Sequence, residues 1–128
     1  MDLDDFEQNT RDGLHLGALA GTWIALVAGF AGLRERGGTV GFAPHLPTGM
    51  TRLAITLLMR QRRLCIEITP DTTTYRITAG EPLSMLHDGM PGSVSTETPL
   101  VRPTGKAPSS EPPTQPFGRE PLPRQAVT

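Results

Sequence analysis

The sequence predicts an α+β chain with one long helix of the buried type, a small antiparallel β-sandwich-like domain and a disordered Pro-rich tail. Three observations lead to this prediction. An almost uninterrupted apolar stretch lies near the amino terminus, short segments of alternating polarity follow it, and the chain ends in a segment rich in proline, serine and threonine. We place these three parts at residues 1–36, 37–100 and 101–128.

The apolar stretch runs from Leu14 to Leu33 and reads LHLGALAGTWIALVAGFAGL. A helix with one buried face carries charged residues on its opposite side, but this stretch contains no Asp, Glu, Lys or Arg. Thr10 and Asp12 precede it and supply side-chain oxygens that cap helices. We therefore expect a helix from about Gly13 to Phe30 that must be covered by protein or lipid on every side.

The residues alone leave two environments for this helix open. A stretch of about 20 residues has the length of a membrane span, and Gly17 and Gly21 have the small-xxx-small spacing of paired membrane helices. The insertion energy is marginal, because glycines and a histidine offset the large apolar residues. The alternative is the inner helix of a helical barrel or bundle whose other members lie outside this chain.

The segment after Gly37 changes to the two-residue period of β-strands. Apolar residues alternate with polar ones, and Gly and Pro separate the runs, which is typical of an antiparallel meander within a sandwich. The expected strands cover residues 39–42, 52–59, 63–69, 74–79 and 83–86. Beyond residue 100 the chain has few large apolar residues, so burial there cannot offset the entropy of ordering.

Composition narrows the class of protein. A net charge of −1 argues against a nucleic-acid partner, which would need a basic face to neutralise phosphates. The single cysteine, Cys65, cannot form an internal disulfide and fits a reducing compartment. The first residues, MDLDDFEQNTRD, are acidic where a secretory signal would be basic. We expect a cytoplasmic protein.

Several motifs, in order, resemble the C-terminal part of glycoside hydrolase family 65, which includes maltose, trehalose, kojibiose and nigerose phosphorylases. These motifs are DG-x-H at residues 12–15, AGTW at 20–23, GFAGL at 29–33 and FAPHLP at 42–47. The resemblance covers about residues 1–100. It implies that the apolar helix is the last helix of an (α/α)6 catalytic barrel, and that the β module is the small sandwich that follows it.

The resemblance also implies a chemistry. Family phosphorylases invert configuration: a carboxylic acid protonates the leaving sugar while inorganic phosphate attacks the opposite face, in place of the base-activated water of an inverting hydrolase. The resemblance thus implies the C-terminal portion of an α-glucoside phosphorylase or hydrolase. The family's general-acid glutamate lies upstream of the matched region, so we assign no catalytic residue to this chain and expect it to be inactive alone. Its partners would be an α-linked disaccharide, phosphate and the remaining barrel, with a homo-oligomer left open.

The resemblance assigns one binding residue and two neighbours. His15, in the first turn of the helix, would bind phosphate in the assembled enzyme, where helix N-termini favour anions. Gly13 and Thr22 would line the site. We expect no metal site and no cofactor apart from inorganic phosphate as co-substrate, and we expect His45 and His87 to be solvated loop residues. Two alternatives are a stand-alone β-sandwich binding or interaction module and a single-span membrane protein.

Overall fold

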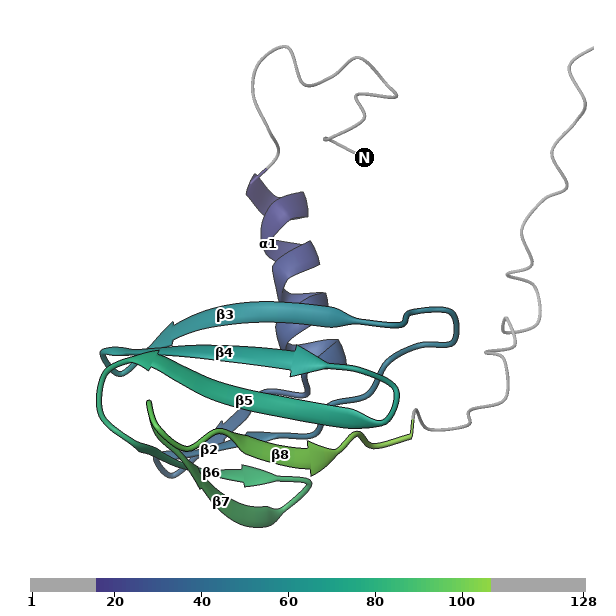
Figure 1. Ribbon diagram of the computed structural model, residues 1–128. Helices are drawn as coiled ribbons and strands as arrows, with labels where there is room; N and C mark the ends of the chain where they lie inside the picture. The colour runs from purple at the N-terminus through teal and green to yellow at the C-terminus, as the bar shows by residue number, and fades with distance from the viewer. Residues whose placement is uncertain (1–15, 107–128) are drawn as a thin grey trace, which may run out of the picture.

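The computed structural model describes residues 16–106, which form a helix followed by a β-sandwich (Figure 1). The helix has an α-helical part, α1 (Leu16–Ile24), and a π-helical part, η1 (Ala25–Phe30). The strands of this described part are β1 (Arg34–Arg36), β2 (Thr39–Phe42), β3 (Leu53–Met59), β4 (Arg62–Ile68), β5 (Thr72–Ala79), β6 (Leu83–His87), β7 (Met90–Val94) and β8 (Leu100–Pro103).

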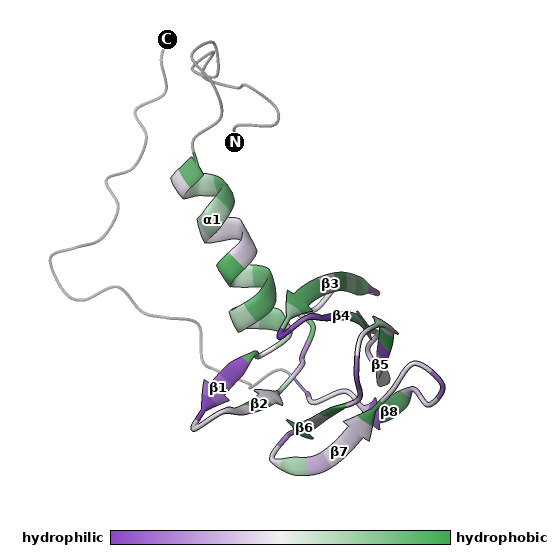
Figure 2. Cartoon of the chain, turned by 90° about the vertical axis from the view of Figure 1, so that its left-hand side faces the viewer, coloured by the Kyte–Doolittle hydropathy of each residue, from purple (hydrophilic) through white to green (hydrophobic). Residues whose placement is uncertain are grey.

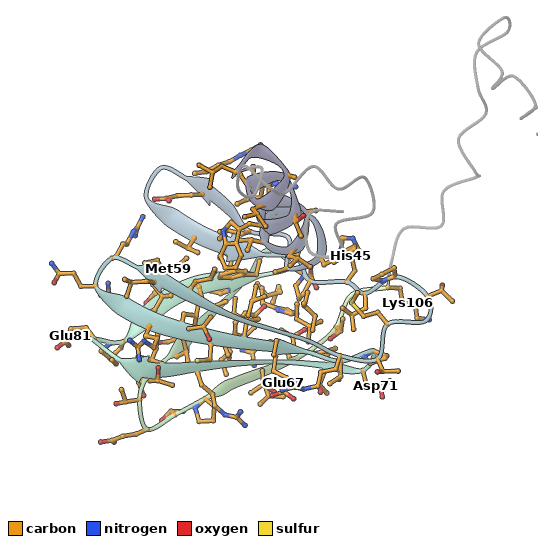
Figure 3. The ribbon with its side chains drawn as sticks, turned by 90° about the horizontal axis from the view of Figure 1, so that it is seen from above. His45, Met59, Glu67, Asp71, Glu81 and Lys106 are labelled. Carbon is orange, nitrogen blue, oxygen red and sulfur yellow. The ribbon has the colours of Figure 1, made fainter. Side chains whose placement is uncertain are left out.

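The strands form two four-stranded sheets, and the predicted sandwich is confirmed. One sheet has the order β1-β2-β6-β7 and the other the order β3-β4-β5-β8. Neighbouring strands are antiparallel except β2 and β6, which run parallel, with Gly41 beside Leu86 and Phe42 beside His87. In the view from above, Met59 and Glu81 mark one end of the sandwich, and Asp71 and Lys106 mark the other (Figure 3).

The core lies between the sheets and follows the alternation seen in the sequence. On β4, for example, Leu64, Ile66 and Ile68 are buried, and their neighbours along the strand are more exposed. Each such strand turns one face inward because side chains alternate along a strand. The buried apolar residues are Val27, Ala31, Val40, Phe42, Ile55, Leu57, Leu64, Ile66, Ile68, Tyr75, Ile77, Leu83, Met85, Val94 and Leu100.

The end of the sandwich differs from the predicted meander. Strands β3, β4 and β5 pair in order, but the next strand, β6, joins the other sheet beside β2 and β7. The place next to β5 is taken by β8. Sequence alternation did not predict β7 and β8, because β7 contains Pro91 and Gly92 and β8 contains Pro103. Both are edge strands, where proline is tolerated.

Two of the expected boundaries shift. The expected tail begins at residue 101, but β8 continues to Pro103 and pairs with β5. The expected helical part extends to residue 36, but β1 already pairs with β2 there. Gly37 and Gly38, at φ 53° and 81°, form the turn of this hairpin, where their positive φ angles favour glycine. The helix itself stops at Phe30, as predicted.

Candidate functional site

The helix α1 carries the largest apolar surface that remains uncovered in the described part of the chain. None of its residues is buried, and it projects from the sandwich as a largely apolar rod (Figure 2). The exposed fractions of Leu16, Trp23 and Ile24 are 79%, 48% and 61%. A continuous apolar surface of this kind marks an interaction site in a soluble protein.

Of the predicted site residues, Thr22 alone falls in the described range. His15 and Gly13 lie outside the described residues. Thr22 is exposed on α1, and its hydroxyl donates a hydrogen bond to the Ala18 carbonyl of the same helix at 2.9 Å. This bond leaves the oxygen lone pairs of the hydroxyl available to a donor from another molecule.

The carboxyl end of the helix is joined to the loop that follows β2. The His45 amide donates to the Phe30 carbonyl at 2.9 Å. Gly32, at φ 63°, lies so close to Ala43 that a Cβ on Gly32 would sit 2.3 Å from the Ala43 carbonyl oxygen. The GFAGL and FAPHLP motifs, which are separated in the sequence, therefore contact each other here.

Histidine at position 87 is buried, so the prediction of a solvated loop residue was wrong. Its ring is 4% exposed, with Nδ1 2.8 Å from the Tyr75 hydroxyl and Nε2 2.8 Å from the Pro103 carbonyl. A carbonyl only accepts, so Nε2 donates to the Pro103 carbonyl, and Nδ1 and the Tyr75 hydroxyl share the other hydrogen bond. The network ties β5, β6 and β8 together, which is a structural role. His45 is half-buried at the joint with the helix.

Burial is the main cause that raises the pKa of the Tyr75 hydroxyl far above its ordinary value of 10.0, and the Asp88 carboxylate adds to the effect. The unfolded chain would lose this proton near pH 10 while the folded chain keeps it, so the network stabilises the fold fully below pH 10. That stability is lost progressively as the pH rises above about 10.

We therefore expect the ultraviolet absorbance of tyrosinate, from the single tyrosine of this chain, to appear only when alkali unfolds the sandwich. The measurement is an alkaline titration followed by absorbance and by circular dichroism on the same sample. In concentrated urea the midpoint should return to about pH 10. Ionisation of Tyr75 near pH 10 with the β-sheet signal intact would contradict the buried environment.

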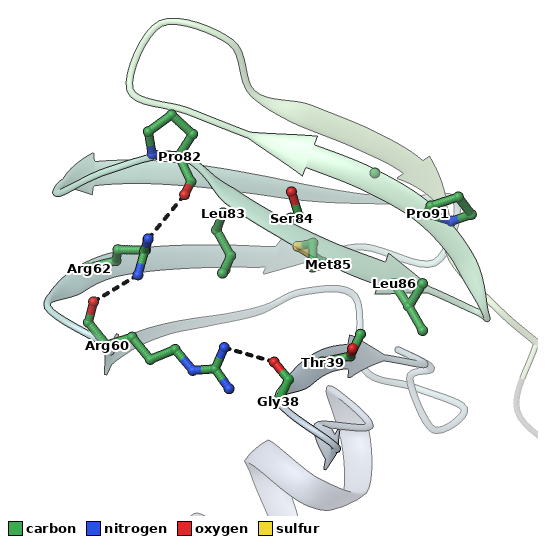
Figure 4. A pocket seen from close by; sticks show the side chains of 11 residues that line it. Gly38, Thr39, Arg60, Arg62, Pro82, Leu83, Ser84, Met85, Leu86 and Pro91 are labelled. Atoms are coloured by element: carbon green, nitrogen blue, oxygen red, sulfur yellow. Dashed lines mark hydrogen bonds between the residues drawn. The ribbon is translucent and has the colours of Figure 1, made fainter.

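An open groove of about 690 Å³ lies where β2 and β6 diverge (Figure 4). Its two arginines are both engaged with the protein. Arg60 donates to the Gly38 carbonyl at 2.8 Å and pairs with Glu35, and Arg62 donates to the Glu81 carbonyl at 2.9 Å. These bonds link the β3–β4 turn to the other sheet, so the arginines act as a brace.

Two of the described carboxylates, Glu67 and Glu35, are engaged by arginines and do not suggest acid–base catalysis. A hydrogen bond from Arg52, at 3.0 Å, and the charge of that guanidinium lower the pKa of Glu67, which remains an ionised surface residue. Glu35 is paired with Arg60. Within residues 16–106 no three His, Cys, Asp or Glu side chains are grouped so as to hold a metal ion.

Comparison with known proteins identifies the sandwich. Residues 33–92, from the residue before β1 into β7, match the family model described as glycosyl hydrolase family 65, C-terminal domain. This domain belongs to glycosyl hydrolase family 65. The match includes the FAPHLP motif at residues 42–47, and it confirms the predicted resemblance to a family of carbohydrate-metabolising enzymes.

The family 65 relatives are much longer than this chain. An uncharacterized glycosyl hydrolase of Mycobacterium tuberculosis is 41% identical over 99% of the chain, which spans 16% of that protein. An α,α-trehalose phosphorylase of Thermoanaerobacter brockii is 33% identical over 68% of the chain, which spans 11% of it. A solved protein from the human microbiome, assigned as a kojibiose phosphorylase, shares the fold with a TM-score of 0.69 at 20% identity, over 79% of this chain and 14% of that one.

Over the described part of the chain, α1 and η1 included, no helix reaches the length and apolar character needed to cross a bilayer.

Proposed function

We propose that this chain works as the C-terminal part of a cytoplasmic disaccharide phosphorylase, with α1 completing an (α/α)6 catalytic barrel. The observation that carries this proposal is the exposed apolar surface of α1 on a domain that belongs to family 65. Relatives named trehalose, maltose and kojibiose phosphorylase support an α-linked disaccharide and phosphate as substrates.

Burial of α1 against other protein elements is energetically favoured over its exposure to solvent. Full burial of one large apolar side chain stabilises a structure by about 1.5–3 kcal/mol. Four such side chains on α1 are more than one third exposed: Leu16, Leu19, Trp23 and Ile24. A helical barrel would bury such a helix, since each inner helix of a barrel packs against neighbouring helices on several sides.

In this proposal the chemistry is divided between the barrel and the chain. The barrel supplies the carboxylic acid that protonates the leaving sugar, and phosphate attacks the opposite face of the glucosyl ring. The chain contributes His15 to the phosphate site, and Gly13 and Thr22 line the active site. Protonated histidine and the positive end of a helix dipole both stabilise a phosphate anion.

The test is a fusion in which this chain replaces the matching segment of the Thermoanaerobacter brockii trehalose phosphorylase. The fusion is incubated with trehalose, maltose or kojibiose, with and without phosphate, and glucose 1-phosphate is measured. We expect phosphate-dependent release of glucose 1-phosphate from the fusion, and none from the chain alone or from the truncated barrel. Free glucose released equally without phosphate would indicate a hydrolase, and product from the chain alone would refute the proposal.

A further inference from the structure

The contacts between the helix and the sandwich fix the orientation of the helix. Ala31, the first residue after η1, is 0% exposed, and Val27 of η1 is 6% exposed, so the helix end is set into the core. On the other side, the Gly32 backbone lies against the Ala43 backbone too closely for any side chain. A contact between two backbones lets the helix tilt less, relative to the sandwich, than a contact between flexible side chains would.

Arg34, on β1, closes the joint. Its Nη1 donates to the Ala28 carbonyl at 2.8 Å and to the Leu33 carbonyl at 2.7 Å. The carbonyls at the end of a helix have no partner within the helix and carry partial negative charge. The guanidinium therefore ties the last turn of η1 to the first strand of the sandwich and stabilises the helix end electrostatically.

We propose that Arg34 and Gly32 fix the orientation of the helix relative to the sandwich, and that this orientation positions the far end of the helix for the reaction. The helix from residue 16 to residue 30, at about 1.5 Å per residue, is roughly 20 Å long. A tilt of about 10° at the joint would move its far end by roughly 3–4 Å. A misplacement of about 1 Å in an active site can cost about 100-fold in rate.

This inference rests on the proposed function only for its effect on catalysis, because the joint itself can be tested in the chain alone. Arg34→Ala removes the tie, Arg34→Lys keeps one cationic donor, and Arg36→Ala changes the other arginine of the same strand, which makes none of these bonds to the helix end. Gly32→Ala is a second route to the same displacement, since its Cβ would collide with the backbone of Ala43.

The first measurement is amide hydrogen exchange in peptides that cover residues 25–33 of the chain. The amides of Ala31 and Leu33 donate to the carbonyls of Leu26 and Val27 and should be protected in the wild type. We expect exchange about tenfold faster in Arg34→Ala, partial recovery in Arg34→Lys and wild-type rates in Arg36→Ala, with peptides of β4 unchanged in all variants. Equal exchange in the Arg34→Ala and Arg36→Ala variants would overturn the role of Arg34 in the joint.

The second measurement is steady-state phosphorolysis by the active fusion. We expect Arg34→Ala to raise the apparent KM for phosphate by about five- to tenfold and to leave the KM for disaccharide within about twofold, because the proposed phosphate ligand, His15, adjoins the far end of the helix in the sequence. A loss of folded protein would lower kcat and leave both KM values unchanged, and that result would overturn the positioning role. An inactive wild-type fusion would count against the proposed function, and hydrogen exchange would still decide the joint.

Discussion

Replacing Tyr75 with alanine should remove most of the stability of the sandwich. The side chain is 0% exposed, its ring lies 5.5 Å from the ring of Phe42, and its hydroxyl bonds to His87. Truncating a large buried aromatic residue costs about 3–5 kcal/mol, and a buried polar group left without its partner costs about 1–3 kcal/mol more. Since a domain is stable by only about 5–15 kcal/mol, we expect much of this one to unfold.

The measurement is urea denaturation of the chain followed by circular dichroism. Tyr75→Phe keeps the ring and removes only the hydroxyl, so it should cost about 1–3 kcal/mol. Thr78→Ala, on an exposed position of the same strand, should change stability by less than about 0.5 kcal/mol. If Tyr75→Phe were as damaging as Tyr75→Ala, the hydrogen bond and not ring packing would dominate. A small effect of Tyr75→Ala would contradict the packing described for this core.

Replacing His15 with alanine should weaken phosphate binding by the active fusion by about ten- to a hundredfold and leave disaccharide binding nearly unchanged. The reason is the loss of a charge-assisted hydrogen bond, which contributes about 1.5–3 kcal/mol. The measurement is the rate of phosphorolysis against phosphate concentration, with disaccharide saturating. Because a histidine that faces a ligand adds little to a core, the variant should fold as the wild type does.

The control for His15 is Thr78→Ala. Thr78 lies at an exposed position of β5, in the sheet that does not contain the strand following the helix. It should leave the phosphate dependence within about twofold of the wild type, because a surface substitution away from the helix and its joint acts weakly. An unchanged phosphate dependence in His15→Ala, or equal losses for sugar and phosphate, would mean that His15 is not a phosphate ligand.

Local pattern determined the parts of this protein that depend on neighbouring residues. The apolar run without charges predicted a helix that one small domain cannot cover, and the structure shows α1 with no buried residue. The alternation on β3, β4 and β5 predicted three paired strands with one buried face, because successive side chains on a strand point in opposite directions. The sequence also showed that residues 29–33 and 42–47 resemble motifs of the family. It did not show why these positions carry small residues.

Tertiary structure decided what depends on residues far apart in the chain. Which sheet a strand joins is not encoded in its alternation, since either sheet offers an inner face, and β6 pairs with β2 instead of extending the meander. His87 looked like a loop residue and became a core residue because the hydroxyl of Tyr75 and the carbonyl of Pro103 converge on its two nitrogens. The second glycine of GFAGL, Gly32, is explained only by its contact with the backbone of Ala43. Such a close approach of two chain segments is a property of the fold and not of either segment.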